Sequence, residues 1–216
     1  GFSVYRFLPV DRNEERNNPL HEVRAFGRAE IWYPLAIGAI GFSGMFCVFS
    51  YLAPTLLEVT EVSDGWIPVV LFIFGLGGFT GNILGGWIFD RLQFKGVGWL
   101  LLWATGTLLI FPLTTDNLWS MMAMCFLVAL MVGLGPALQT HLMDVAHGAQ
   151  TLAAASHHAA FNVANALGPW LGGLAITAGF GWESTGYVGA TTAVAGLMIF
   201  FMAWRQLSTA GATSSA

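Results

Sequence analysis

The segment GNILGGWIFDRLQFKG, Gly81 to Gly96, closes a long glycine-rich apolar run with three charged residues, Asp90, Arg91 and Lys95. Upstream of them, residues 65–89 carry no charge. A helix needs about 20 apolar residues to cross the roughly 30 Å of hydrocarbon in a bilayer. The segment therefore predicts a membrane-spanning helix that leaves the bilayer at Asp90.

The rest of the chain repeats this pattern. Its 216 residues are 56% hydrophobic and only 9% charged, whereas soluble domains carry about 25% charged residues. The apolar runs are too long, and too uniformly apolar, for the roughly 10-residue alternating strands of a membrane β-barrel. We therefore predict an all-α membrane protein with six transmembrane helices, at about 31–57, 65–89, 97–115, 118–142, 151–178 and 184–204.

The basic residues predict the orientation of these helices. With six spans, all eight fall on one side of the membrane: Arg6, Arg12, Arg16, Arg24, Arg28, Arg91, Lys95 and Arg205. Lys and Arg are enriched in cytoplasmic loops, so we expect an inner-membrane, multi-pass protein with both termini cytoplasmic. Residues 1–30 then form a cytoplasmic loop segment, 31–205 the bundle, and 206–216 a disordered cytoplasmic tail.

Glycines in the second expected span predict close helix packing. Gly77, Gly81 and Gly85 recur every fourth residue, and a parallel row holds Gly78, Asn82 and Gly86. Helices associate in lipid through van der Waals contact, and small residues let their backbones approach. A second helix is expected against this face.

Asp90 raises a separate question, because an acid at a helix C-terminus is disfavoured by the helix dipole. We expect a nearby partner, which could be Arg91, Lys95 or the N-terminus of another helix. The pattern Gly86-x-x-x-Asp90-Arg91-x-x-x-Lys95 resembles the cytoplasmic loop signature of the major facilitator superfamily, which the family uses between its second and third helices and again between the eighth and ninth. This chain departs from the pattern at Gln93, where the family has glycine, and at Gly96, where a second basic residue is common.

A second motif supports the same family. GPWLGG, with Gly168, Pro169, Gly172 and Gly173, resembles a motif in the fifth helix of proton-coupled efflux members. Together with residues 41–60 and 138–146, the chain is similar to the C-terminal six-helix half of arabinose-efflux and chloramphenicol-resistance permeases, which are drug:proton antiporters. The resemblance covers about residues 20–205, with His141 where those relatives are expected to have arginine. It implies that Gly86, Asp90, Arg91 and Lys95 act as a cytoplasmic gating latch.

Polar residues at membrane depth are functional candidates, because hydrocarbon leaves them unsatisfied. His158, Asn162, Asn165 and Pro169 share one helical face in the fifth span. This face either lines a water-filled translocation path or makes hydrogen bonds between helices. His157 points away from it and is expected to pack. Candidates without a spacing argument, which could equally be helix contacts, are Tyr51, Ser43 and Gln139.

No motif indicates an enzyme. His141, Asp144 and His147 share a helical face, but no HExxH, G-x-S-x-G or phosphate-binding loop accompanies them. Cys47 and Cys125 both fall inside spans, so no disulfide framework is indicated. We expect no metal, no cofactor and no nucleic-acid partner, and a gradient rather than ATP as the energy source.

These observations predict the C-terminal half of a secondary active transporter that exports a small molecule by alternating access, coupled to protons. Its partners would be the lipid bilayer, the substrate, and an N-terminal six-helix half or a second copy of the chain. A self-contained six-span homodimeric carrier, or a non-transporting membrane scaffold, is the alternative. A basic loop at the start suits the second half of a longer protein, although a processed or truncated six-span protein would look the same.

Overall fold

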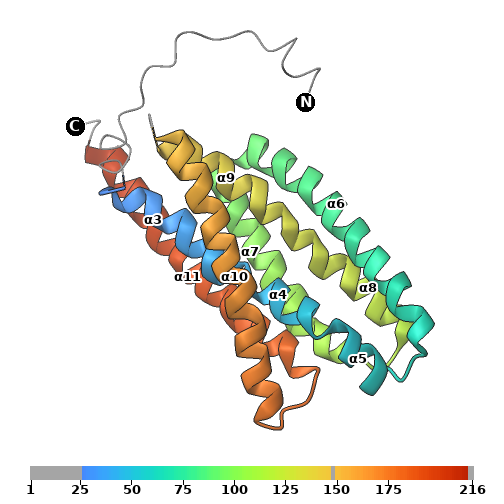
Figure 1. Cartoon of the computed structure of the whole chain (residues 1–216). Helices are drawn as coiled ribbons and strands as arrows, with labels where there is room; N and C mark the ends of the chain where they lie inside the picture. Colours follow the sequence, from blue (N-terminus) through green and yellow to red (C-terminus); the bar gives the residue numbers. More distant parts are fainter. Residues whose placement is uncertain (1–25, 147–148, 214–216) are drawn as a thin grey trace, which may run out of the picture.

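The computed structural model describes residues 26–146 and 149–213, which form helices joined by short connections (Figure 1). Successive rods run antiparallel and pack side by side. The first rod is interrupted, and comprises α3 (Ala29–Ala36), the π-helical turn η1 (Ile37–Gly41), α4 (Ser43–Ser50) and α5 (Leu52–Glu58). The later elements are η2 (Asp64–Trp66) with α6 (Ile67–Leu92), α7 (Phe94–Ile110) with η3 (Phe111–Thr114), α8 (Leu118–Ala129), η4 (Leu130–Gly133) and α9 (Leu134–Val145), α10 (Gln150–Thr177), and α11 (Ser184–Thr213).

Five of these rods are long and apolar enough to cross a membrane. They are Ala29–Ser50, Asp64–Leu92, Phe94–Thr114, Leu118–Val145 and Ser184–Gln206. The exception is α10, which occupies the expected fifth span and is 28 residues long. Its sequence is rich in Ala and Gly and also carries His and Asn, so its apolar character is weaker. The expectation of spanning helices is therefore supported for five segments.

The C-terminal end of the chain differs from the prediction. α11 continues to Thr213, so residues 206–213 are helical and not a disordered tail. Nothing between Arg205 and Ala210 stops a helix, because neither Gly nor Pro occurs there. The expected cytoplasmic segment 1–30 lies almost wholly outside the described residues.

Backbone irregularities in the first and fourth rods lie near prolines. The π-helical turn η1 follows Pro34, the break at Tyr51 precedes Pro54, and the 3-10 turn η4 precedes Pro136. Pro169, in contrast, lies inside α10 without interrupting it. Pro68 stands in the first turn of α6, where a missing N–H costs no intrahelical hydrogen bond.

Glycines bring the helix backbones into contact, as the spacing in α6 predicts. Gly77, Gly81 and Gly85 are all buried on one side of α6. A Cβ added at Gly81 would lie 2.5 Å from the carbonyl oxygen of Leu130 in η4. Gly133 of η4 meets Gly85 in the same contact.

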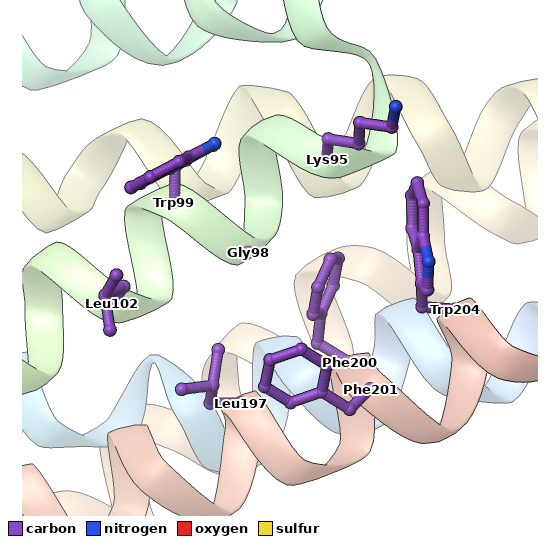
Figure 2. Close-up of a pocket in the computed structure, with 8 residues that line it drawn as sticks. All are labelled: Lys95, Gly98, Trp99, Leu102, Leu197, Phe200, Phe201 and Trp204. Atoms are coloured by element: carbon purple, nitrogen blue, oxygen red, sulfur yellow. The ribbon is translucent and has the colours of Figure 1, made fainter.

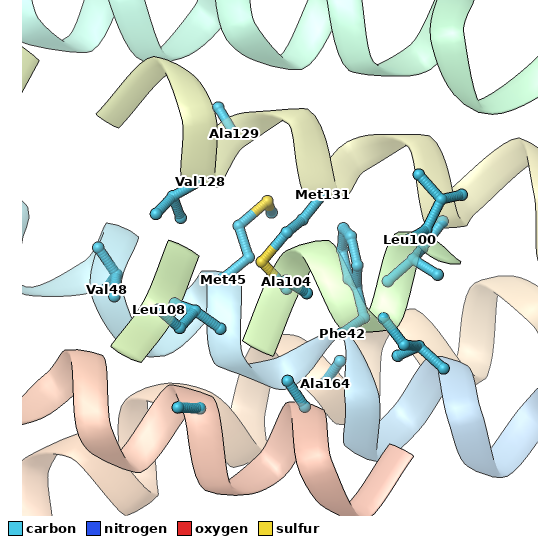
Figure 3. Close-up of a cluster of buried hydrophobic side chains, with 14 of the residues drawn as sticks. Phe42, Met45, Val48, Leu100, Ala104, Leu108, Val128, Ala129, Met131 and Ala164 are labelled. Atoms are coloured by element: carbon cyan, nitrogen blue, oxygen red, sulfur yellow. The ribbon is translucent and has the colours of Figure 1, made fainter. Parts of the chain in front are cut away.

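Two further glycine pairs join the first rod to α11. A Cβ on Gly44 would lie 2.5 Å from the carbonyl oxygen of Gly189, and one on Gly196 would lie 2.6 Å from the Cα of Gly41. The core beside these contacts is filled by side chains from the first rod, α7 and the fourth rod (Figure 3). Its members include Phe42, Met45, Val48, Leu100, Leu108, Val128 and Met131.

Candidate functional site

The polar face of α10 points out of the bundle. His158, Asn162 and Asn165 are all exposed. The opposite face of α10 is buried and holds small residues such as Ala160, Ala164 and Gly168. Three residues of the predicted stripe therefore share one exposed side of the helix, and the fourth, Pro169, is half-buried.

His157, next to this stripe, is buried as predicted, with 5% of its surface exposed. Its ring lies 4.6 Å from that of Phe161, and Phe161 in turn lies 4.4 Å from Phe42 in the first rod. His157 thus belongs to the aromatic packing between α10 and the first rod, while His158 faces away from it.

The GPWLGG motif forms the tightest part of the contact between α10 and α4. A Cβ added at Gly168 would meet the backbone of Ser43, and one added at Gly172 would lie 2.8 Å from Sγ of Cys47. The glycines in this motif therefore act as packing positions, as small residues do in membrane helix contacts.

Tyr51, which follows α4, also contacts the GPWLGG motif. Its hydroxyl donates a hydrogen bond to the carbonyl oxygen of Pro169 at 2.8 Å. Its ring lies over the motif, because a Cβ on Gly172 would be 3.0 Å from it and one on Gly173 would be 2.6 Å from the hydroxyl oxygen. Tyr51 is half-buried, and its hydroxyl is turned into the helix contact.

The two other candidates without a spacing argument lie apart. Gln139 is half-buried on α9, and α9 packs against both α6 and α10. Ser43 is fully buried, and its hydroxyl donates to the carbonyl oxygen of Ile40 in its own rod. The structure therefore does not gather the predicted path residues into one cluster.

Two of the three partners considered for Asp90, Arg91 and Lys95, do not pair with it. Asp90 is exposed, and it forms no ion pair with Arg91 or Lys95. The guanidinium of Arg91 lies 4.4 Å from the ring centroid of Trp87, and Nζ of Lys95 lies 5.4 Å from that of Trp204. Cations favour aromatic faces, while exposed ion pairs add little stability, so the tryptophans replace the carboxylate as partners.

Sequence reasoning overlooked both tryptophans. Trp87 lies four residues before Arg91, a spacing that places two side chains on the same helix face, so this contact could have been predicted. Trp204 belongs to α11, and only the tertiary structure brings it to Lys95.

Gly86 and Gln93, at the same end of α6, have special surroundings. A Cβ on Gly86 would meet nothing within 4 Å, so this motif glycine packs against no other part of the described chain. Gln93 ends α6 with φ 50° and ψ −141°, a backbone conformation that strongly favours glycine. The structure thus accounts for the glycine that the family signature has at this position.

His141 stacks on the start of α7. Its ring lies 4.2 Å from that of Phe94 at an interplanar angle of 26°, and 6.4 Å edge-on from Phe89. Across residues 26–146 and 149–213, no group of three His, Cys, Asp or Glu side chains is placed to hold a metal. His147, the third member of the pattern considered with Asp144, lies outside the described residues.

Small and polar positions are also exposed on the outer side of α6. Gly75 and Gly86 have open space around them, and Asn82 is exposed. α9 packs against both α6 and α10, but Gly75 and Gly86 meet nothing on it. Such a surface can face water or another protein, but polar groups facing lipid would be costly.

Comparison with known proteins places this arrangement in a family. Residues 2–155 match the Major Facilitator Superfamily. Three relatives illustrate the similarity. Inner membrane transport protein YdhP of Escherichia coli (strain K12) is 30% identical over 206 residues, which is 94% of this chain and 53% of the relative. A probable sugar efflux transporter of Pasteurella multocida is 29% identical, over 77% of this chain and 41% of the relative. A chloramphenicol resistance protein of Streptomyces lividans is 29% identical, over 78% and 44%. The chain spans about half the length of these relatives.

Proposed function

This chain belongs to the major facilitator superfamily, and from that premise we propose that it forms the C-terminal six-helix half of a secondary active transporter. The transporter exports a small molecule of the drug or sugar class by alternating access, coupled to protons. The direction of transport and the substrate class come from the names of the relatives. Both termini lie in the cytoplasm, on the side that carries the basic residues.

The observation that carries this proposal is the exposed polar face of α10. His158, Asn162 and Asn165 would meet hydrocarbon if these helices were the whole protein, and an unsatisfied polar group there costs several kcal/mol. An N-terminal half packed across this face would enclose the polar side chains around a water-filled path. The exposed Asn82 and the open Gly86 on α6 add a second contact for the same half.

The same argument makes α10 the sixth spanning helix. Its 28 residues extend about 42 Å at 1.5 Å per residue, which is longer than the hydrocarbon core. A helix that faces protein and water on one side needs fewer apolar residues than one surrounded by lipid. This explains why α10 is less apolar than the other five rods.

Few residues of this chain are candidates for coupling proton movement to transport. Within the five apolar segments, the carboxylates lie at or near the ends, as Glu30, Asp64, Asp90 and Asp144 do. His158 is the exposed titratable group on the polar face of α10. We therefore assign proton coupling either to His158 or to a residue of the other half.

Thiol labelling tests the position of the path. In the complete two-half transporter, His158→Cys and Asn162→Cys should react with a membrane-impermeant thiol reagent. Leu102→Cys, on the apolar outer side of α7, is the matched control and should not react. The native Cys47 and Cys125 are buried and give little background.

If none of the three introduced cysteines reacts with the thiol reagent, the α10 face does not line a water-filled path. A separate flux assay distinguishes the alternative. If this chain alone, reconstituted in liposomes, transports substrate and crosslinks as a dimer, the six-span homodimeric carrier holds and the two-half transporter is wrong.

A further inference from the structure

An apolar groove runs between α7 and α11 on the outer surface of the bundle. Its volume is about 310 Å³, within the roughly 300–1,000 Å³ of ligand pockets. Figure 2 shows the two helices facing each other, with Lys95 and Trp204 at one end and Leu102 and Leu197 at the other. We call it the α7–α11 groove, and its lining residues are Lys95, Gly98, Trp99, Leu102, Leu197, Phe200, Phe201 and Trp204.

The floor of the groove depends on Gly98. A Cβ added there would lie 2.6 Å from two carbon atoms of the Phe200 ring. Phe200 is buried, and Phe94 and Trp204 hold it from both sides, with ring centroids at 5.0 and 6.0 Å. The groove therefore has a packed aromatic ring, that of Phe200, at its floor.

The lining has a distinct chemistry. Its polar side-chain atoms include the ammonium of Lys95 and the indole N–H of Trp99, both of which donate hydrogen bonds and neither of which accepts one. No acidic side chain lines the groove. Lys95 forms no ion pair in the part of the chain that the structure describes. An anionic acceptor is the complement of this set, and the apolar remainder suits a hydrocarbon chain.

The groove faces outward. Trp99 is 62% exposed and Phe201 55% exposed, and these are apolar surfaces, unlike the polar face of α10. Lys95 stands one residue after the start of α7, at the end of the bundle where α6 carries Arg91 in its last turn. A second apolar cavity, lined by Met198, Phe201, Met202 and Arg205, adjoins the groove along α11.

We propose that the α7–α11 groove binds an anionic phospholipid, with the lipid phosphate at Lys95 and one acyl chain between Trp99, Leu102 and Phe201. Basic pockets between membrane helices on the cytoplasmic side favour anionic headgroups. Tryptophans at membrane interfaces sit at headgroup level. The proposal rests on insertion of the bundle in a membrane and not on transport, so it stands or falls separately from the proposed function.

Native mass spectrometry of the detergent-purified chain tests this site. Phosphatidylglycerol and phosphatidylethanolamine with identical acyl chains are titrated against the protein. The chain should retain one phosphatidylglycerol in preference to phosphatidylethanolamine. Lys95→Gln should weaken phosphatidylglycerol binding about fivefold, the effect of one cation near a lipid headgroup.

Arg91→Gln is the matched control. It removes the same charge from the same end of the bundle, and its guanidinium also lies over a tryptophan, but it is not part of the groove. Binding should be unchanged in this variant. Equal losses in Lys95→Gln and Arg91→Gln, or equal retention of the two lipids, would show general attraction and overturn the site.

A second variant tests the acyl chain. Leu102→Trp fills the far end of the groove without touching the core, since Leu102 is half exposed. It should displace the lipid even with Lys95 intact, whereas Leu109→Trp, at an exposed position outside the groove, should not. Retention of phosphatidylglycerol by Leu102→Trp at the original affinity would rule out the groove as the binding site.

Discussion

Arg91 and Lys95 each place a cation near a tryptophan ring, and Asp90 stands exposed beside them. The sequence indicated charged residues at this boundary, but it did not indicate the two tryptophans that the cations contact. Aromatic faces compete well with an exposed carboxylate at a membrane surface, because the carboxylate keeps its hydration. At the scale of single residues, composition therefore predicts where charges lie and not which groups they contact.

Gln93 offers a test at this scale. Its φ of 50° is strained for any residue with a Cβ, by about 1–3 kcal/mol. Gln93→Gly should remove this strain, offset by about 0.5–1 kcal/mol of extra freedom in the unfolded chain. We expect a higher thermal unfolding midpoint in detergent.

Gln139→Gly is the control for Gln93→Gly. Gln139 lies inside α9, where glycine should destabilise the helix by up to about 1 kcal/mol. A lower midpoint for Gln93→Gly would contradict the assigned strain.

At the scale of elements, the two rows of small residues on α6 have different surroundings. The sequence presented two rows of small residues. Gly77, Gly81 and Gly85 meet the backbone of the fourth rod, whereas Gly78 of the other row meets only the side chain of Val132 there. Gly86 and Asn82, in the other row, face away from it. Periodicity predicts that small residues share a face, but the rotation of the helix in the bundle decides which row is buried.

Gly81→Leu should disrupt the contact between α6 and η4. Its Cβ would lie 2.7 Å from the Cα of Leu130, which is backbone and cannot turn aside, and overpacking of this kind costs about 1–3 kcal/mol. Gly75→Leu is the matched control, because nothing lies within 4 Å of its Cβ. The thermal midpoint in detergent should fall for Gly81→Leu and change little for Gly75→Leu; equal effects would show that the glycine contact is unimportant.

At the scale of the whole molecule, one side of the bundle is unlike the rest. α7 and α11 expose apolar side chains such as Trp99, Leu102 and Met198, as helices in lipid do. α10 exposes the polar His158, Asn162 and Asn165 beside the apolar Val163, Trp170 and Leu174. This asymmetry is what the proposed two-half transporter requires, because its polar side would meet the second half. We also propose that Gly86, Asp90, Arg91 and Lys95 form the latch that the family resemblance implies.

Asp90→Asn tests that latch in the complete transporter. An exposed carboxylate that forms no ion pair within residues 26–146 and 149–213 is available to the other half. Its loss should slow export by about tenfold, equivalent to about 1.4 kcal/mol, while membrane insertion stays normal.

Asp116→Asn changes an exposed acid in the connection between η3 and α8, at the opposite end of the bundle, and should leave the export rate unchanged. Initial rates measured in cells with matched expression compare the two variants. An unchanged rate in Asp90→Asn would remove the latch assignment.

The sequence by itself determined the all-helical membrane class, the approximate position of each rod and the family. These follow from the thickness of the bilayer's hydrocarbon core, from the free-energy cost of placing charge in lipid and from local sequence motifs. None of them depends on how the helices pack against one another. Only the tertiary structure decided that Tyr51 bonds to Pro169, that Lys95 reaches Trp204, and that His158 faces out while His157 is buried. Those facts depend on the rotation and tilt of each helix, which are set by backbone contacts between rods far apart in the sequence.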